Sequence, residues 1–209
     1  MNVKTRQAQH SAATRAALLR VARRLFAEHG YAATGTEGIV RRARVTRGAL
    51  YHHFRDKQDL FIAVLDEEQK KLAAQAAEAA AAQPDPWRAM VAASNVVLEA
   101  CLDQAVQRIV LIDAPAVLGL ERWREADQGY YLAGMKALIQ AAITQGLIED
   151  QPVDALAHII FGALHEAAML IARGEDKAAA RHSVSGVVER LFEGLRGKPN
   201  RKKVVARPS

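Results

Sequence analysis

The sequence predicts an all-α protein in which three short helices are followed by a larger helical bundle. Two observations lead to this prediction. Apolar residues recur every three or four positions in almost every segment, without sustained alternation of period two, and glycines and prolines fall between these periodic runs. The chain has 209 residues, half of them apolar, which suffices for one or two domains with a sizeable core.

The N-terminal part is expected to hold three helices, at residues 12–29, 35–43 and 46–53. The first has an apolar face, and Gly30 follows it as a stop signal. Thr34 and Glu37 have the spacing of a capping box, which predicts the start of the second helix. Thr46 is a suitable N-cap for the third.

A long helix is expected from Lys57 or Gln58 to about residue 82, because its alanine-rich end favours helix up to Pro84. Pro115 is expected to end a later helix, and Pro152 to start another. The second half is thus expected to form five helices, at residues 86–102, 104–113, 122–146, 152–173 and 177–196.

Charge is distributed unevenly along the chain, and this divides it into three regions. Residues 1–57 carry 12 Lys and Arg against 3 Asp and Glu, a net +9; residues 58–197 are at −8, and residues 198–209 at +5. A basic N-terminal domain on an acidic body indicates a polyanion-binding module joined to a second function, although a solvated basic face is the alternative. The basic tail at 198–209 lacks apolar periodicity and is expected to be disordered.

Composition excludes several other classes. Cys101 is the single cysteine, so no disulfide can form within the chain, and a reducing cytoplasm is the expected location. No apolar run approaches the ~18 residues that a membrane helix needs, and the N-terminus lacks a signal-peptide core. We find no metal-ligand cluster, phosphate-binding loop or nucleophile elbow, and expect no cofactor and no enzymatic activity.

The stretch VRRARVTRGALYHHFRDK, residues 40–57, has the pattern of a helix-turn-helix. Val45 would fill the turn, and Leu50 and Phe54, four residues apart, would form the inner face of the second helix. Polar side chains near the start of that helix would then face outward, where arginine can make two hydrogen bonds to a guanine edge. The candidate DNA-binding residues are Thr36, Arg44, Val45, Thr46, Arg47, Gly48, Tyr51, His52 and Lys57.

Arg44 stands at the elbow of this motif, where a left-handed backbone is often needed. That conformation costs arginine on the order of 1 kcal/mol relative to glycine. Two interpretations are open. Either the turn avoids positive φ and Arg44 is an ordinary surface charge, or the strain is tolerated because the guanidinium reaches a DNA phosphate.

The segment LFAEHGYAATGTEGIVRRARVTRGALYHHFRDKQDLF closely resembles the DNA-binding domain of the TetR family of bacterial transcription regulators. The resemblance covers about a quarter of the chain closely and implies a three-helix DNA-binding head followed by a helical ligand-binding and dimerisation body. Val40 and Arg44 stand where the family usually has alanine and glycine, and Gly35 and Gly38 replace a polar cap and an acid.

The resemblance also implies an effector pocket between the helices of the body. Its candidate lining consists of polar or soft residues on otherwise apolar helices: Asn95, Glu99, Cys101, Arg108, Asp113, Trp123, Tyr130, Met135, His158, Phe161, His165 and Met169. For each residue ordinary core packing is the alternative, since methionine and phenylalanine at helical spacing usually pack in a core.

The last two helices carry small and apolar residues that suit a homodimer interface, although the same faces could close the monomer's own core. The resemblance therefore implies a dimeric repressor that releases a palindromic double-stranded DNA operator when a small molecule binds the body, with no membrane partner. The alternative is a sequence-independent DNA-binding or architectural protein, whose affinity would fall with salt without any preferred site.

Overall fold

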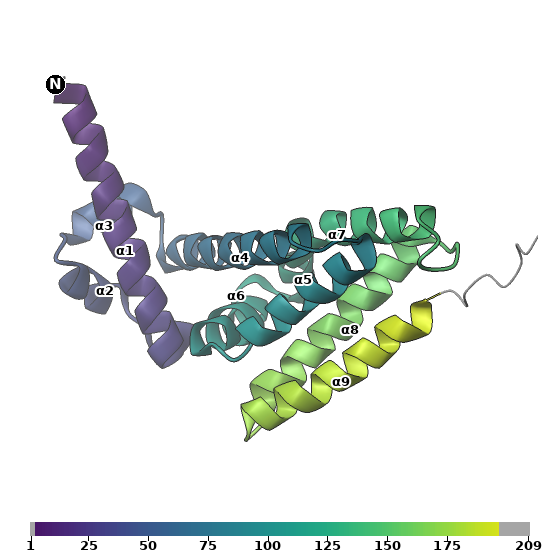
Figure 1. Cartoon of the computed structure of the whole chain (residues 1–209). Helices are drawn as coiled ribbons and strands as arrows, with labels where there is room; N and C mark the ends of the chain where they lie inside the picture. The colour runs from purple at the N-terminus through teal and green to yellow at the C-terminus, as the bar shows by residue number, and fades with distance from the viewer. Residues whose placement is uncertain (1–2, 197–209) are drawn as a thin grey trace, which may run out of the picture. The chain divides into compact units, whose positions relative to one another are not determined.

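A computed structural model describes residues 3–196, and these form helices joined by short connections (Figure 1). The described residues contain no β-strand beyond an isolated antiparallel bridge between Ile148 and Arg196. The all-α prediction is therefore confirmed. The helices are α1 (Val3–Ala33), α2 (Thr36–Ala43), α3 (Arg47–His53), α4 (Lys57–Ala81), α5 (Pro86–Ala100), the π-helix η1 (Val106–Asp113), α6 (Ala114–Leu118), α7 (Leu120–Thr144), α8 (Val153–Arg173) and α9 (Lys177–Leu195).

The chain divides into two compact units whose boundaries fall inside helices. The first unit holds the residues up to Ala74 together with Glu99–Tyr130, and the second holds Gln75–Leu98 and the residues from Tyr131 onward. The first unit therefore contains the basic head, the N-terminal part of α4, the whole of η1 and α6, and the start of α7. The basic tail expected at residues 198–209 lies outside the described residues.

In the first unit α1, α2 and α3 pack on one another around a small core. Three aromatic rings form a cluster with centroids 5.1 to 5.9 Å apart: Phe26 and Tyr31 of α1, and Phe61 of α4. Ile39 and Leu50, the predicted inner residues of α2 and α3, are fully buried. Burial of these apolar side chains fixes the angle between the two short helices, which are too short to be stable alone.

Two predictions about the first helices are wrong in detail. Helix α1 begins at Val3 instead of residue 12, since the N-terminal stretch contains no residue that breaks a helix. Thr34 does not cap α2, because its buried hydroxyl donates to the carbonyl oxygens of Gly30 and Leu25 at 2.7 and 3.2 Å. Gly35 is the N-cap instead, so no side chain caps the start of α2.

The prediction that Pro115 ends a helix is also wrong. Residues Val106–Asp113 form a π-helix, and Pro115 lies in the first turn of α6, which continues to Leu118. Pro115 has no N–H to donate, yet the helical backbone continues through it, and the N–H of Ala114 just before it still bonds to the Ile109 carbonyl. The chain turns at Gly119, whose φ is 81°.

The remaining helices lie within a few residues of their predicted ranges, and Pro152 is the N-cap of α8 as expected. In the second unit α8 and α9 lie side by side (Figure 1). Helix α8 buries seven apolar residues on one face, and Val188 and Phe192 are buried on α9. By length and composition alone α8 could cross a membrane. Its apolarity is explained at least in part by this packing.

Candidate functional site

Helix α3 presents a polar surface at its N-terminal end. Thr46 caps the helix by accepting a hydrogen bond from the backbone N–H of Ala49 at 3.1 Å. Leu50 anchors the opposite face and is fully buried, while Tyr51 is 43% exposed. The predicted outward-facing residues are all exposed: Thr46, Arg47, Gly48, Tyr51 and His52. A duplex could therefore reach this end of α3 without disturbing the core.

The side chains on this surface also order one another. The guanidinium carbon of Arg47 lies 5.6 Å from the ring centroid of Tyr51, which is one helical turn later. The His52 and His53 rings meet edge to face at 5.2 Å. Burial lowers the pKa of His53, with smaller contributions from His52 and Arg15. A lowered pKa favours the neutral form of His53. Arg47 carries the one guanidinium group of α3.

The elbow between α2 and α3 adopts a left-handed backbone at Arg44, with φ 57° and ψ 40°. The N–H of Arg44 bonds to the Arg41 carbonyl at 3.3 Å, and the N–H of Val45 bonds to the Val40 carbonyl at 3.1 Å. These are the two hydrogen bonds of a Schellman helix end. The interpretation that the turn avoids positive φ is therefore wrong, and arginine occupies a position that favours glycine.

Replacing Arg44 with glycine should raise the free energy of unfolding by up to about 1 kcal/mol, because it relieves the strain of the left-handed backbone. Urea unfolding would measure this change. Arg42→Gly is the matched control: it removes the same charge from within α2 and should lower stability by about 1 kcal/mol. If Arg44→Gly proved destabilising, the elbow strain inferred from φ would be wrong.

Four arginines lie at this elbow or within three residues of it. Arg41, Arg42, Arg44 and Arg47 are exposed, and within residues 3–196 none of them forms an ion pair or a hydrogen bond through its side chain. Four uncompensated guanidinium groups on adjoining turns produce a positive surface beside the start of α3. Such a surface favours a polyanion over a neutral ligand.

Lys57 and Thr36 lie at the edge of this surface, at the first residues of α4 and α2. The ammonium of Lys57 donates to the carbonyl oxygens of Tyr31 and Thr34 at 2.9 and 3.2 Å and lies 4.1 Å from the Tyr31 ring centroid. It therefore holds the connection between α1 and α2, and has at most one proton left for a phosphate. Thr36 is half-buried.

Two residues that the sequence predicts to line a ligand pocket hold the end of α1. Asp113 accepts a hydrogen bond from the N–H of Tyr31 at 2.6 Å and lies 3.4 Å from Nε of Arg108. Gly30 has φ 79°, and a Cβ there would come within 2.2 Å of the Arg108 guanidinium. Glycine at position 30 thus allows Arg108 to pack on the backbone, and this cluster fixes η1 against α1.

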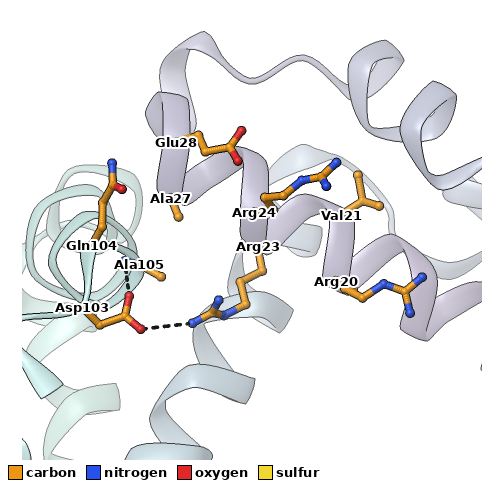
Figure 2. A pocket seen from close by; sticks show the side chains of 9 residues that line it. All are labelled: Arg20, Val21, Arg23, Arg24, Ala27, Glu28, Asp103, Gln104 and Ala105. Carbon is orange, nitrogen blue, oxygen red and sulfur yellow. Dashed lines mark hydrogen bonds and ion pairs between the residues drawn. The ribbon is translucent and has the colours of Figure 1, made fainter.

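A cavity of about 500 Å³ lies between α1 and residues 103–105, just before η1. Figure 2 shows the side chains that line it. Arg23 reaches from α1 toward Asp103, which lies 3.8 Å from its Nη2. Arg23 also donates to Glu68 of α4 at 2.5 and 2.9 Å. These hydrogen bonds raise the pKa of Arg23 above its ordinary value, against the opposing effect of burial. The cavity wall is thus held by an ion-pair network that ties three segments of the first unit together.

Three of the other candidate pocket residues line two further cavities. One of about 280 Å³ is lined by residues of α4 and α7, among them Trp123 and Tyr130. Another of about 580 Å³ lies in the second unit and is lined in part by Asn95. The remaining candidates do not line any of these three cavities: Glu99, Cys101, Met135, His158, Phe161, His165 and Met169.

The α4–α7 cavity also contains residues that the sequence interpretation missed. Asp127 is 9% exposed, and its Oδ1 accepts a hydrogen bond from Nε2 of Gln69 at 2.6 Å. Burial raises the pKa of Asp127 from its ordinary 3.8 to about 6. Asp66 accepts a hydrogen bond from the Tyr130 hydroxyl, and burial, together with this bond, raises the pKa of Tyr130 to about 12. No group of three or more His, Cys, Asp or Glu among residues 3–196 could hold a metal ion.

Two family models match the chain. Residues 18–64 match the bacterial regulatory proteins of the tetR family, and residues 87–195 match the tetracyclin repressor-like C-terminal domain. The first match covers α2, α3 and about the second half of α1, which include the elements that build the surface described above. Both models describe transcription regulators.

Among solved structures, a TetR-family transcriptional regulator from Pectobacterium atrosepticum is 37% identical, with a TM-score of 0.81 over 92% of this chain and 98% of that one. FadR from Bacillus subtilis, solved with stearoyl-CoA, is 18% identical with a TM-score of 0.69 over 82% and 96% of the two chains, which shows the shared fold alone.

Among curated proteins, the HTH-type transcriptional repressor Rv1474c of Mycobacterium tuberculosis is 43% identical over 65 residues, 31% of this chain. The matched part spans about a third of that relative, 35% of its length. The Tn10 TetC protein of Escherichia coli is 24% identical over 78% of this chain and 82% of its own length. With a regulator 37% identical along nearly its whole length and a family model that matches half of the chain, this protein belongs to the TetR family of transcription regulators.

Proposed function

We propose that the protein is a homodimeric transcriptional repressor that binds a palindromic operator and releases it when a small molecule binds the body. The observation that supports this most directly is α3, which exposes Thr46, Arg47 and Tyr51 on one face while Leu50 holds the other face in the core. A recognition helix needs this arrangement, because its N-terminal side chains must reach base edges in the major groove.

The DNA contacts follow from the placement of the side chains. Arg47 is assigned to a guanine edge and Thr46, Tyr51 and His52 to phosphates or bases, with Gly48 allowing close approach. Arg44 and the third proton of Lys57 are assigned to phosphates, and Val45 and Thr36 to the edge of the interface. The free guanidinium groups at positions 41, 42 and 44 support this assignment, because phosphate contacts supply most of the affinity.

Helices α8 and α9 provide a surface for dimerisation. One face of α9 closes the core of the second unit through Val188 and Phe192, whose ring lies 5.9 Å from that of Trp87. The large apolar residues Ile159, Leu170, Val187 and Leu191 remain between 49% and 69% exposed on the two helices. Apolar exposure on adjacent helices marks an interaction surface. A second copy of the chain would cover it and would supply the second recognition helix that a palindrome requires.

Release by a ligand follows from linkage. A molecule that binds one arrangement of the dimer better than the operator-bound arrangement lowers operator affinity by the same factor. Rv1474c and the AcnR protein of Corynebacterium diphtheriae are named repressors, which supports repression as the direction of control. A DNA-binding regulator of this kind acts in the cytoplasm.

Gel-shift titration against the DNA flanking the protein's own gene tests this function. We expect a specific shift that survives competition by scrambled duplex, with half-sites one helical turn, 34–36 Å, or somewhat more apart. Light scattering should give about twice the 22.8 kDa chain mass. Equal binding to flanking and scrambled duplexes would instead favour a sequence-independent DNA-binding protein.

A further inference from the structure

The α4–α7 cavity lies wholly within the compact unit that contains the recognition helix. Its volume of about 280 Å³ is just below the ~300 Å³ at which the usual range of small-molecule pockets begins. Its wall combines the apolar side chains of Ile62 and Leu65 with the aromatic rings of Trp123 and Tyr130. The cavity is thus sized for a small molecule with an apolar part.

The charge of the cavity centres on Asp127. Its side chain is nine-tenths buried, and no cationic side chain within residues 3–196 pairs with it. Oδ1 accepts the hydrogen bond from Gln69, whereas Oδ2 receives no hydrogen bond from any described residue. A buried carboxylate with one neutral hydrogen-bond donor is costly to keep ionised, because burial removes its solvation without supplying a counter-charge.

The other charged groups of the wall already have partners. Asp66 pairs with Lys70 at 2.7 Å and with the Tyr130 hydroxyl. Asp59 pairs with Arg55 at 3.4 Å.

Arg15, which also lines the cavity, lies 3.9 Å from Glu67 and over the Phe54 ring at 5.4 Å. Asp127 is therefore the wall's single carboxylate without a cation in the described part of the chain.

We propose that this cavity binds a small organic cation, with an ammonium group on Asp127 and its apolar part against Trp123 and Tyr130. A cation would supply the missing counter-charge, and aromatic rings attract cations through their faces. An anionic ligand would meet the like charges of three carboxylates, and a neutral one would leave Asp127 uncompensated. The inference deepens the proposed function by naming the class of effector.

Isothermal titration of the full-length protein at pH 7.5 tests the inference with benzylamine and benzyltrimethylammonium as cations and benzyl alcohol as the neutral counterpart. We expect both cations to bind at least tenfold more tightly than benzyl alcohol. Asp127→Asn, which keeps the shape of the side chain, should weaken cation binding at least tenfold. Glu121→Gln removes the same charge from an exposed position of α7 and should leave the affinity unchanged.

Circular dichroism would confirm that both variants fold. Cation binding no tighter than that of benzyl alcohol, or equal binding by wild type and Asp127→Asn, would overturn the inference. A gel shift with and without the cations separates this result from the proposed function. Cations that bind through Asp127 without releasing DNA would leave the cavity assignment standing and would contradict ligand-controlled release. Specific operator binding without any cation binding would contradict the cavity assignment and would leave the DNA-binding function standing.

Discussion

Arg47→Ala should relax operator specificity at one base position in each half-site and weaken operator binding by about 30-fold or more. A bidentate arginine–guanine contact contributes about 1–3 kcal/mol of discrimination, and a palindrome contains two such contacts. The guanidinium of Arg47 is exposed and lies over Tyr51 at 5.6 Å, so it is oriented before DNA arrives. Less conformational entropy is lost on binding as a result.

Fluorescence anisotropy with an operator and with single-base variants of it would measure the effect. Arg55→Ala is the matched control, because Arg55 is an exposed head arginine that pairs with Asp59 just after α3. It should lower affinity for all duplexes slightly, without changing the preferred base. If Arg47→Ala lowered affinity for every duplex by the same factor, Arg47 would be a phosphate contact and specificity would lie elsewhere.

The head could be predicted in detail because its signals are local. Thr46, Leu50 and Tyr51 lie within one short helix, so helical periodicity alone separates the buried residue from the exposed ones. The cap at Thr46 likewise depends on one side chain and one N–H three residues later. Such features need no knowledge of the distant parts of the chain.

Features that depend on tertiary contacts were missed. The capping-box spacing at Thr34 was overridden because the hydroxyl is buried against the α1 carbonyls, whereas a capping side chain must face the next helix. The role of Asp113 in accepting a hydrogen bond from the N–H of Tyr31, 82 residues earlier in the chain, was not predicted. No local pattern indicates such a partner.

Asp127 was missed for a related reason. In the sequence it stands in a polar stretch, EADQGYY, and is ordinary for the exposed face of a helix. Its burial arises because Gln69, 58 residues earlier, lies against it from α4. This contact between α4 and α7 forms part of the cavity wall and buries the charge of Asp127. Neither feature can be predicted without knowing that the two helices pack together.

Asp127→Asn should stabilise the protein at pH 7 by about 3 kcal/mol. Burial raises the pKa of Asp127 from 3.8 to about 6, and each pKa unit corresponds to about 1.4 kcal/mol. A raised pKa means that the folded state holds the proton more tightly than the unfolded state. Stability from this group is therefore complete below pH 3.8 and is lost as the pH rises to about 6. Asparagine does not titrate, so the gain in stability of Asp127→Asn over wild type should grow over that pH interval and stay constant above it.

Urea unfolding of wild type and Asp127→Asn at pH 4, 5, 6 and 7 would give this profile. Asp66→Asn is the matched control with the opposite sign. Burial acts to raise the Asp66 pKa, but hydrogen bonds from Lys70 and Tyr130 outweigh it and lower the pKa, so this variant should be less stable than wild type above pH 4. An Asp127→Asn variant equal to wild type at pH 7 would show that the carboxylate is well solvated. A gain that appears only above pH 4 would instead show that the protein keeps a destabilising charge in this cavity, as binding sites commonly do.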